Sequence, residues 1–271
     1  MRIALVGGDA RMPYAAAALE GMGHEASVCA YRDTPFSPSA LAVAEAVLFP
    51  LPITRDGVHL NAPTTDIPTP LDALARILPE GVPLLCGHAD DATRAVAGDR
   101  PILAYGQNEA YLERNSYVSA EGAIAILMAH LQTALSDTPC LILGSGRLAS
   151  ALTDLLCGLH APVTVLARRQ DVLLGGGHIP LPLSELSGLS AKFPVILNTV
   201  PARLLSQAVL ESITPGTLIL ELSSAPNVLD AELARRRGIE VQTAPGLPGR
   251  YAPKSAGQAI ADAVAALLAE R

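Results

Sequence analysis

CLILGSGRLASALTDLLCGLHAPVTVLA, residues 140–167, is the stretch that decides the fold of this 271-residue chain. Its first four residues form an apolar run, Gly144–Gly146 follow as a glycine-rich turn, and residues 148–159 have a helical pattern. A second apolar run, Val163–Ala167, comes next. Short apolar runs on either side of a helix predict a βαβ unit, in which two parallel strands lie in one buried sheet.

The turn in this unit has the spacing of a dinucleotide-binding loop. Gly144, Gly146 and Ala149 fit G-x-G-x-x-[GA] directly after a strand and at the start of a helix. The first glycine allows the tight turn, the second lets the backbone approach a pyrophosphate, and a small third residue lets helix and strand pack closely. The helix N-terminus adds free amides and a partial positive charge. We therefore expect the pyrophosphate at Gly144, Ser145, Gly146, Arg147 and Leu148. The alternative is a structural glycine turn.

The end of the next strand bears on the choice of dinucleotide. An NAD site usually has Asp or Glu about 20 residues after the loop. This chain has Arg168 and Arg169 there, and two guanidinium groups suit a 2′-phosphate. We expect NADP rather than NAD, although a solvated Arg pair on a loop is the alternative. Further on, Thr199, Val200 and Pro201 follow a strand at the ligand-binding edge and should border the nicotinamide ribose, or form an ordinary strand-to-helix turn.

The same alternation of strands and helices runs along the rest of the chain. Strands are expected at residues 2–6, 25–31, 46–50, 83–86, 101–104, 195–199, 217–222 and 239–243. Helices are expected at 13–22, 120–135 (with Ser119 as N-cap), 202–213, 229–237 and 255–269. The sequence therefore predicts an α/β fold of two Rossmann-like parallel-sheet domains in tandem, residues 1–118 and 119–271, joined by a long helix.

The turn at residues 7–11, Gly-Gly-Asp-Ala-Arg, looks similar but should not bind a nucleotide. Asp9 would repel a phosphate at the helix amides, so we expect it to cap that helix itself. Arg11 is then free to meet an anionic substrate in a cleft, or lies on the surface.

Composition excludes several classes of function. Hydrophobic residues make up 50% of the chain and the formal net charge is −7, which argues against disorder and against a nucleic-acid face. No apolar run approaches the roughly 18 residues of a membrane span, and no signal peptide is evident, so we expect a cytoplasmic protein. The four cysteines lack metal-ligand spacing, and we expect no metal. None of the six histidines pairs with a carboxylate at catalytic spacing.

The remaining cluster of polar residues lies in the segment at residues 244–258, APGLPGRYAPKSAGQ. We expect a rigid loop after the last strand, with Arg250 and Lys254 at the nicotinamide end of the cleft. Lys254 could bind a carboxylate, or act as an acid or base if desolvation lowers its pKa. The alternative is that it starts the last helix on the surface.

Together these motifs resemble the family of the dipicolinate synthase A subunits. The resemblance rests on VGGDAR (6–11), NS (115–116), EG (121–122), LGSGR (143–147), Arg168, NTVP (198–201) and APGLPGRYAPKSAGQ (244–258), in order. It implies a fold like that of the D-2-hydroxyacid dehydrogenases and adenosylhomocysteinase, with a substrate domain first and a last helix that packs back on it. Residues 33–100 offer no motif match.

The resemblance also implies an activity. It would be the NADP-dependent oxidation of dihydrodipicolinate, or of its hydroxy-tetrahydro precursor, to dipicolinate in the mother-cell cytoplasm of a sporulating bacterium, with a flavoprotein-like B subunit in a homo- or hetero-oligomer. By position, the implied catalytic residues are Lys254 and Glu121. The implied substrate-binding residues are Gly8, Asp9, Arg11, Asn115, Ser116 and Arg250.

Two other functions remain open at this point. The chain could be an NADP-dependent reductase of another small oxo or imino acid. It could also be a non-catalytic nucleotide-binding scaffold for the B subunit.

Overall fold

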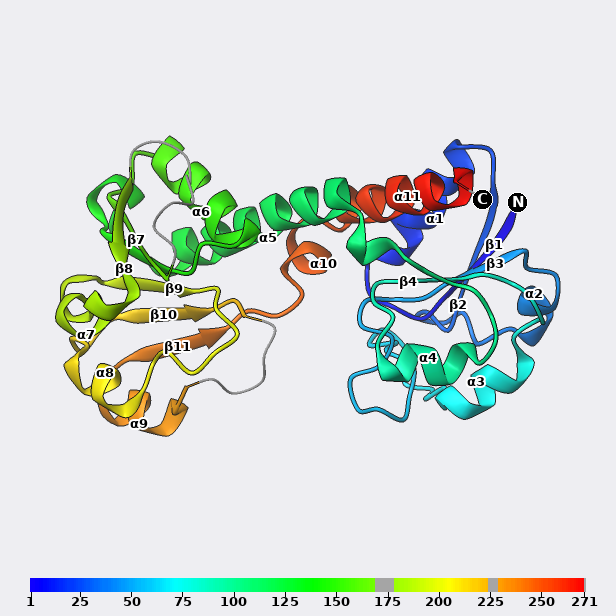
Figure 1. The fold of residues 1–271 in the computed structure, drawn as a ribbon, viewed down its shortest axis with the longest axis horizontal. Coiled ribbons are helices and arrows are strands. Elements are labelled where there is room, and N and C mark those ends of the chain that lie inside the picture. The colour runs from blue at the N-terminus through cyan, green and yellow to red at the C-terminus, as the bar shows by residue number, and fades with distance from the viewer. Residues whose placement is uncertain (169–177, 224–228, 271) are drawn as a thin grey trace. The chain divides into compact units, whose positions relative to one another are not determined.

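The computed structural model describes residues 1–168, 178–223 and 229–270. Its contacts divide the chain into two compact units (Figure 1). One comprises Met1–Asn115 with Pro248–Arg271, and the other comprises Ser116–Leu247. Each unit holds one parallel sheet, which confirms the expected pair of parallel-sheet α/β domains. The division differs from the expected boundaries of 1–118 and 119–271 because the last segment makes its contacts with the first unit.

The first unit is built on a five-stranded sheet with the order β2-β1-β3-β4-β5. The strands are β1 (Arg2–Val6), β2 (Glu25–Cys29), β3 (Ala46–Leu48), β4 (Leu84–Cys86) and β5 (Ile102–Ala104). The helices are α1 (Arg11–Gly21), α2 (Pro38–Ala42), α3 (Leu71–Ile77), α4 (Asp91–Ala97), α10 (Leu247–Tyr251) and α11 (Pro253–Ala269). All strand pairs are parallel, so the carboxyl ends of the strands share one edge.

Both faces of this sheet are covered, which explains why its strands read as continuous apolar runs. Ala4 and Val6 of β1 pack with α2, α3 and α4, whereas Ile3 and Leu5 pack with α1 and α11. Figure 1 shows α11, in red, lying along α1, in blue. The C-terminal helix thus completes a core that begins at residue 2.

The second unit carries a sheet with the order β11-β10-β9-β6-β7-β8 within the residues that the structure describes. The strands are β6 (Cys140–Leu143), β7 (Val163–Ala167), β8 (His178–Pro182), β9 (Val195–Asn198), β10 (Leu218–Glu221) and β11 (Glu240–Thr243). The helices are α6 (Arg147–Gly158), α7 (Leu186–Leu189), α8 (Gln207–Ser212) and α9 (Ala231–Arg236), with most of α5 (Glu109–His130). Read from β8, the order is 3-2-1-4-5-6, that of a dinucleotide-binding Rossmann domain.

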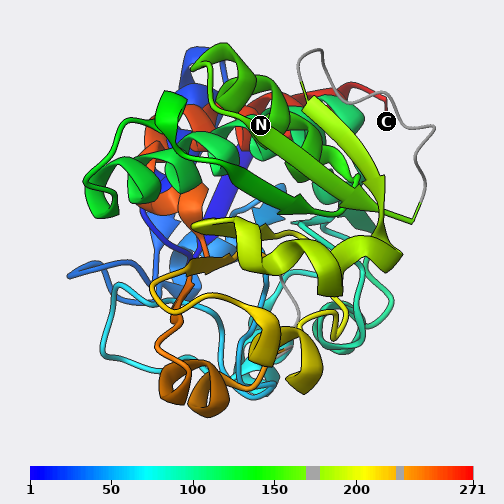
Figure 2. The same ribbon diagram turned by 90° about the vertical axis from the view of Figure 1, so that its left-hand side faces the viewer.

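Alternate residues of each strand face opposite sides of this second sheet. Cys140 and Ile142 pack with α5 and α6, whereas Leu141 and Leu143 pack with α7, α8 and α9. Figure 2, which faces this unit, shows helices on both sides of the strands.

The long linking helix lies earlier in the chain than expected. The prediction placed it at residues 120–135 with Ser119 as N-cap, but α5 spans Glu109–His130 and Ser119 lies in its interior. The Asn108 Oδ1 atom accepts a hydrogen bond from the Tyr111 amide at 3.0 Å. Asn108 therefore begins the helix, and residues 109–119 are helical, with Glu113 and Arg114 exposed and Asn115 and Ser116 half-buried.

Two other helices also differ from their expected bounds. The helix expected at 202–213 is reduced to α8, because the Ser206 hydroxyl caps it by accepting the Val209 amide. The last helix begins at Pro253 rather than at residue 255, with a proline in its first turn.

Candidate functional site

Gly144 ends β6 in a conformation that only glycine adopts without strain. Its φ is +114°, and its amide donates to the Leu166 carbonyl at 2.8 Å. A Cβ atom there would overlap the Thr199 Oγ1 atom and would lie 2.9 Å from the Val200 Cγ2 atom. The expected tight turn is therefore present, and the turn after β9 closes over it.

Gly146, unlike Gly144, has open space around it. It is exposed, has an extended backbone as the N-cap of α6, and a Cβ atom there would meet nothing within 4 Å. As a glycine, Gly146 has no side chain that could cap the first turn of α6. Ala149 is fully buried against the sheet. Open space at Gly146 before the helix amides, with close packing behind them, fits a pyrophosphate at Ser145, Gly146, Arg147 and Leu148.

The turn after β9 is held by a buried polar pair. The Asn198 Nδ2 atom donates to the Glu221 Oε2 atom at 2.7 Å, and the Asn198 Oδ1 atom accepts the Val200 amide at 3.1 Å. The Thr199 hydroxyl donates to the Leu143 carbonyl at 2.7 Å. Pro201 is exposed. Sequence reasoning missed Glu221, because only the pairing of β9 with β10 brings it beside Asn198.

These two turns flank the point where the strand order reverses. β6 pairs with β7 on one side and with β9 on the other, and α6 after β6 and α8 after β9 pack on opposite faces of the sheet. In open α/β sheets, ligands bind at this switch point, at the carboxyl ends of the strands. The structure thus brings Gly144, Thr199 and Val200 together.

Arg168 directly follows β7 and is exposed. This is the position expected for a residue near the adenosine ribose of a dinucleotide. Arg169, predicted to assist it, lies outside the described residues.

The turn after β1 corrects the expectation for Arg11. Arg11 is not free: it is buried, and its Nε and Nη2 atoms donate to the two carboxylate oxygens of Asp9 at 2.8 and 3.0 Å. Asp9 also accepts the Arg11 amide at 3.1 Å, although Ala10 is the N-cap residue. A carboxylate two residues from a buried guanidinium offers it a bidentate partner within the chain, which leaves little charge for a ligand.

The electrostatics of this pair follow from its geometry. Burial opposes ionisation of Asp9, but the hydrogen bonds and the charge of Arg11 outweigh it, so the pKa of Asp9 lies below its ordinary value. Burial likewise opposes the charge on Arg11, but Asp9 raises the pKa of Arg11 above its ordinary value. Nearby, burial raises the pKa of Tyr105 and of Tyr111. The hydroxyl of Tyr111 is buried without a hydrogen-bond partner.

Two glycines of the 244–258 segment pack against this first turn of α1. A Cβ atom at Gly249 would lie 2.7 Å from the Asp9 Oδ2 atom, and one at Gly257 would lie 2.6 Å from the Arg11 carbonyl oxygen. The GGDAR and APGLPGRYAPKSAGQ motifs, far apart in the sequence, are therefore neighbours in the first unit. Gly8 belongs to the same turn and has a φ of +87°.

The other residues of that segment differ from the expected rigid loop. Residues 247–251 form α10, and Lys254 lies exposed in the first turn of α11, which was the surface alternative. Arg250 is exposed, and its guanidinium lies 5.6 Å from the ring centre of Tyr251.

The remaining predicted site residues lie on α5. Asn115 and Ser116 are half-buried, and Glu121 is exposed. Asn115 belongs to the first unit, whereas Ser116 and Glu121 belong to the second.

The expectation that none of the histidines pairs with a carboxylate was wrong. The His59 Nδ1 atom lies 2.8 Å from the Asp56 Oδ2 atom, and the His130 Nδ1 atom lies 3.4 Å from the Glu240 Oε1 atom. The first pair is local to a tight turn, and the second joins the end of α5 to β11, which sequence spacing does not reveal. In the described ranges, no group of three or more His, Cys, Asp or Glu side chains is placed to hold a metal ion. Among the same residues, no helix is long and apolar enough to cross a membrane.

The fold is shared with a known class of two-domain proteins. The chain has the two-domain architecture of the nicotinamide-dependent dehydrogenases: D-lactate dehydrogenase of Escherichia coli superposes with a TM-score of 0.62 at 14% identity, over 100% of this chain and 98% of that one. At that identity the likeness shows the fold alone.

Two comparisons of the sequence identify more specific relatives. Residues 2–105 match the family model for the N-terminal domain of the dipicolinate synthase A subunit. The dipicolinate synthase A subunit of Bacillus subtilis (strain 168) is 37% identical over 159 residues, which are 58% of this chain and 54% of that protein. The aligned sequence thus spans about half of that relative.

Solved structures of such subunits match over nearly their whole length. The dipicolinate synthase A chain of B. subtilis gives a TM-score of 0.84 at 26% identity, covering 99% of this chain and 95% of that one. The corresponding protein from Bacillus halodurans gives 0.87 at 24% identity, covering 99% and 98%. Residues 2–105 thus match the family of N-terminal domains of dipicolinate synthase A subunits, and the whole chain is similar to those subunits in fold.

Proposed function

We propose that this chain is an NADP-dependent oxidoreductase subunit that converts dihydrodipicolinate, or its hydroxy-tetrahydro precursor, to dipicolinate. The observation that supports it most is the glycine loop at the switch point of a Rossmann sheet, in a chain whose residues 2–105 match the family model for the N-terminal domain of dipicolinate synthase A subunits. By the same similarity we propose that it works with a B subunit, in the cytoplasm of a sporulating cell.

In this proposal the second unit holds the dinucleotide. Gly144, Ser145, Gly146, Arg147 and Leu148 hold the pyrophosphate, and Thr199, Val200 and Pro201 border the nicotinamide ribose. The nicotinamide ring, when bound, supplies the acceptor for the hydride. The chain itself positions the nucleotide. The Asn198–Glu221 pair fixes the turn that packs against Gly144.

The choice of NADP over NAD rests on Arg168. Its exposed guanidinium after β7 suits the 2′-phosphate, with Arg169 as the expected second contact. We expect Arg168→Asp to weaken NADPH binding far more than NADH binding in fluorescence titrations. Equal losses for the two nucleotides would refute the assignment.

The proposed substrate contacts lie mostly in the first unit. Lys254 is exposed at the start of α11, as suits an ammonium group that binds a carboxylate, and Arg250 offers a second cation. Gly8, Asp9, Asn115 and Ser116 are the other proposed contacts, whereas Arg11 acts by holding Asp9. Loss of two hydrogens from dihydrodipicolinate leaves one proton to be taken up, and Glu121 and Lys254 are the candidates for it.

Purified chain, dihydrodipicolinate and NADP, with and without a B subunit, test this function. We expect the ultraviolet absorbance of dipicolinate to rise together with that of NADPH. No dipicolinate in any combination would defeat the proposal. Lys254→Ala should reduce turnover while NADPH affinity is retained, and unchanged turnover would favour a scaffold role instead.

A further inference from the structure

The substrate in this proposed function carries two carboxylates. Arg11, a buried cation of the first unit, is already paired with Asp9. Arg11 is 9% exposed, and both oxygens of Asp9 are bonded to its guanidinium. A carboxylate that approached Arg11 would have to compete with a bidentate partner two residues away. Arg11 is therefore not available to a carboxylate, and a further cation near the Gly7–Gly8 turn would add to Lys254 and Arg250.

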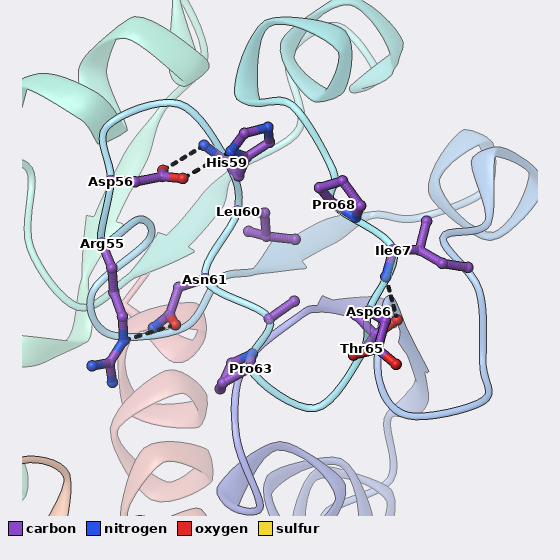
Figure 3. A pocket seen from close by; sticks show the side chains of 11 residues that line it. Arg55, Asp56, His59, Leu60, Asn61, Pro63, Thr65, Asp66, Ile67 and Pro68 are labelled. Carbon is purple, nitrogen blue, oxygen red and sulfur yellow. Dashed lines mark hydrogen bonds and ion pairs between the residues drawn. The ribbon is translucent and has the colours of Figure 1, made fainter.

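The segment between β3 and α3 places a pocket beside that turn. The pocket has a volume of about 300 Å³, at the low end of ligand pockets. Its lining includes Arg55, Asn61, Pro63, Thr65 and Ile67 (Figure 3). The carbonyl of Asn61 accepts the Gly8 amide at 2.8 Å, so the wall of the pocket is bonded directly to the GGDAR turn.

The side chain of Arg55, an exposed residue, is held at its Nε atom by a buried amide. Its Nε atom donates to the Asn61 Oδ1 atom at 3.1 Å, and the Asn61 Nδ2 atom donates to the Pro52 carbonyl at 2.9 Å. Asn61 is 8% exposed. Among the described residues, no carboxylate pairs with Arg55. Its two terminal nitrogens are thus left for a ligand while its Nε atom is fixed.

The acidic residues of the pocket do not neutralise Arg55. Asp56 accepts the amides of Val58 and His59, and its other oxygen contacts the His59 ring at 2.8 Å. In Figure 3, Asp66 lies on the other side of the pocket from Arg55. The charge of Arg55 does reach Asp9, since it helps to lower the pKa of that carboxyl group. Arg55 and the GGDAR turn therefore belong to one electrostatic environment.

We propose that Arg55, oriented by Asn61, binds one carboxylate of the substrate through its two terminal guanidinium nitrogens. The inference rests on the proposed function, which supplies a small dicarboxylate. A planar guanidinium with its Nε atom already fixed is suited to bidentate carboxylate binding, because little side-chain freedom remains to be lost. Asn61 is then a positioning residue.

Calorimetric titration of the full chain with pyridine-2,6-dicarboxylate, without nucleotide and in metal-free buffer, tests this assignment. We expect Arg55→Gln to weaken binding roughly tenfold or more, with Arg55→Lys in between. Arg76→Gln is the matched control, because Arg76 lies exposed on α3 in the same unit and pairs with Asp72; it should bind like the wild type. Unchanged melting temperatures establish that the variants are folded.

A second ligand makes the test specific. Pyridine-2-carboxylate lacks one carboxylate, so the wild type should bind it clearly more weakly than the dicarboxylate. In Arg55→Gln the two ligands should bind with nearly equal affinity, because the second carboxylate has lost its partner. If Arg55→Gln binds the dicarboxylate as the wild type does, the Arg55 assignment is wrong and the proposed function stands. If the wild type does not bind the dicarboxylate, both are overturned.

Discussion

At the scale of single residues, Gly144 and Gly146 have different roles in the proposed nucleotide loop. Gly144→Ala forces a Cβ atom into the Thr199 side chain at a φ of +114°, so it should lower both the melting temperature and the affinity for NADPH. Gly146→Ala has room for its methyl group, so it should leave the melting temperature unchanged and still weaken NADPH binding, because the methyl group occupies the approach to the helix amides. Thermal melting and fluorescence titration measure the two effects.

Gly158→Ala is the control for these variants. Gly158 ends α6, and a Cβ atom there meets nothing within 4 Å. The variant should bind NADPH normally and should melt no lower than the wild type. If Gly146→Ala also binds NADPH normally, the loop is a structural turn and not a nucleotide site.

The Asp9–Arg11 pair should make the stability of the first unit depend on pH. The pKa of Asp9 is lower in the folded protein than its ordinary value of 3.8. Its stabilising contribution is therefore present above that value and is lost as the pH falls through the lower, folded-state pKa. Asp9→Asn should cost about 3 kcal/mol near neutral pH, because it leaves Arg11 buried without a counter-charge.

The difference in unfolding free energy between the wild type and Asp9→Asn should shrink as the pH is lowered below 3.8. Chemical denaturation at several pH values measures it. Asp72→Asn removes an exposed pair with Arg76 and should cost less than about 1 kcal/mol at any pH. A constant cost of Asp9→Asn across the pH range would contradict the ion pair.

The sequence revealed the glycines of both turns but not what surrounds them. The spacing of Gly144, Gly146 and Ala149 follows from local backbone geometry, so it is visible in one chain. The partner of Arg11 was mistaken because local sequence does not show whether Asp9 caps the helix or pairs with the side chain. Glu221 was missed because its partner Asn198 lies on another strand, and Asn61 was missed because residues 33–100 offer no motif match.

At the scale of elements, Asn198 and Glu221 lock the ends of β9 and β10 together. Asn198→Asp places a second carboxylate against Glu221 in a buried position, at a separation now bridged by a 2.7 Å hydrogen bond. We expect a loss of about 3 kcal/mol in the unfolding free energy and weaker NADPH binding, because the Thr199 turn loses its support.

The matched control is Gln207→Glu on α8. The Gln207 Nε2 atom donates to the Glu211 Oε1 atom at 2.8 Å, the same type of contact on an exposed surface. This variant should cost about 0.5 kcal/mol and leave NADPH binding intact. Equal costs for the two substitutions would show that burial of the Asn198–Glu221 pair is unimportant.

Element positions could be predicted where apolar periodicity was strong. The buried strands β6, β7, β9 and β10 lie close to their expected positions, because residues buried on both faces read as apolar runs, whereas the more exposed β8 was not predicted. The start of α5 was missed by about ten residues because its first turns are polar. Its true start depends on one cap, the side chain of Asn108.

At the scale of the whole molecule, the first unit is discontinuous. Its sheet face at Ile3 and Leu5 is covered by α1 and α11, and α11 comes from the other end of the chain. A chain that stops at Leu247 should therefore expose an apolar face, and its first 115 residues should be digested rapidly by protease. Residues 116–247 should still bind NADPH.

The control for that truncation is a chain that stops at Ala269, where α11 ends. It should resist protease like the full chain. If the chain that stops at Leu247 resists protease equally well, α11 is not part of the first unit's core. The family resemblance implied that the last helix packs back on the first domain, and the contacts of α11 confirm it.

A crystal structure of the chain with NADP tests the central claim most directly. We expect density for the pyrophosphate at Gly144–Gly146, with the 2′-phosphate beside Arg168. Density for the pyrophosphate at Gly7–Gly8 instead would contradict the account.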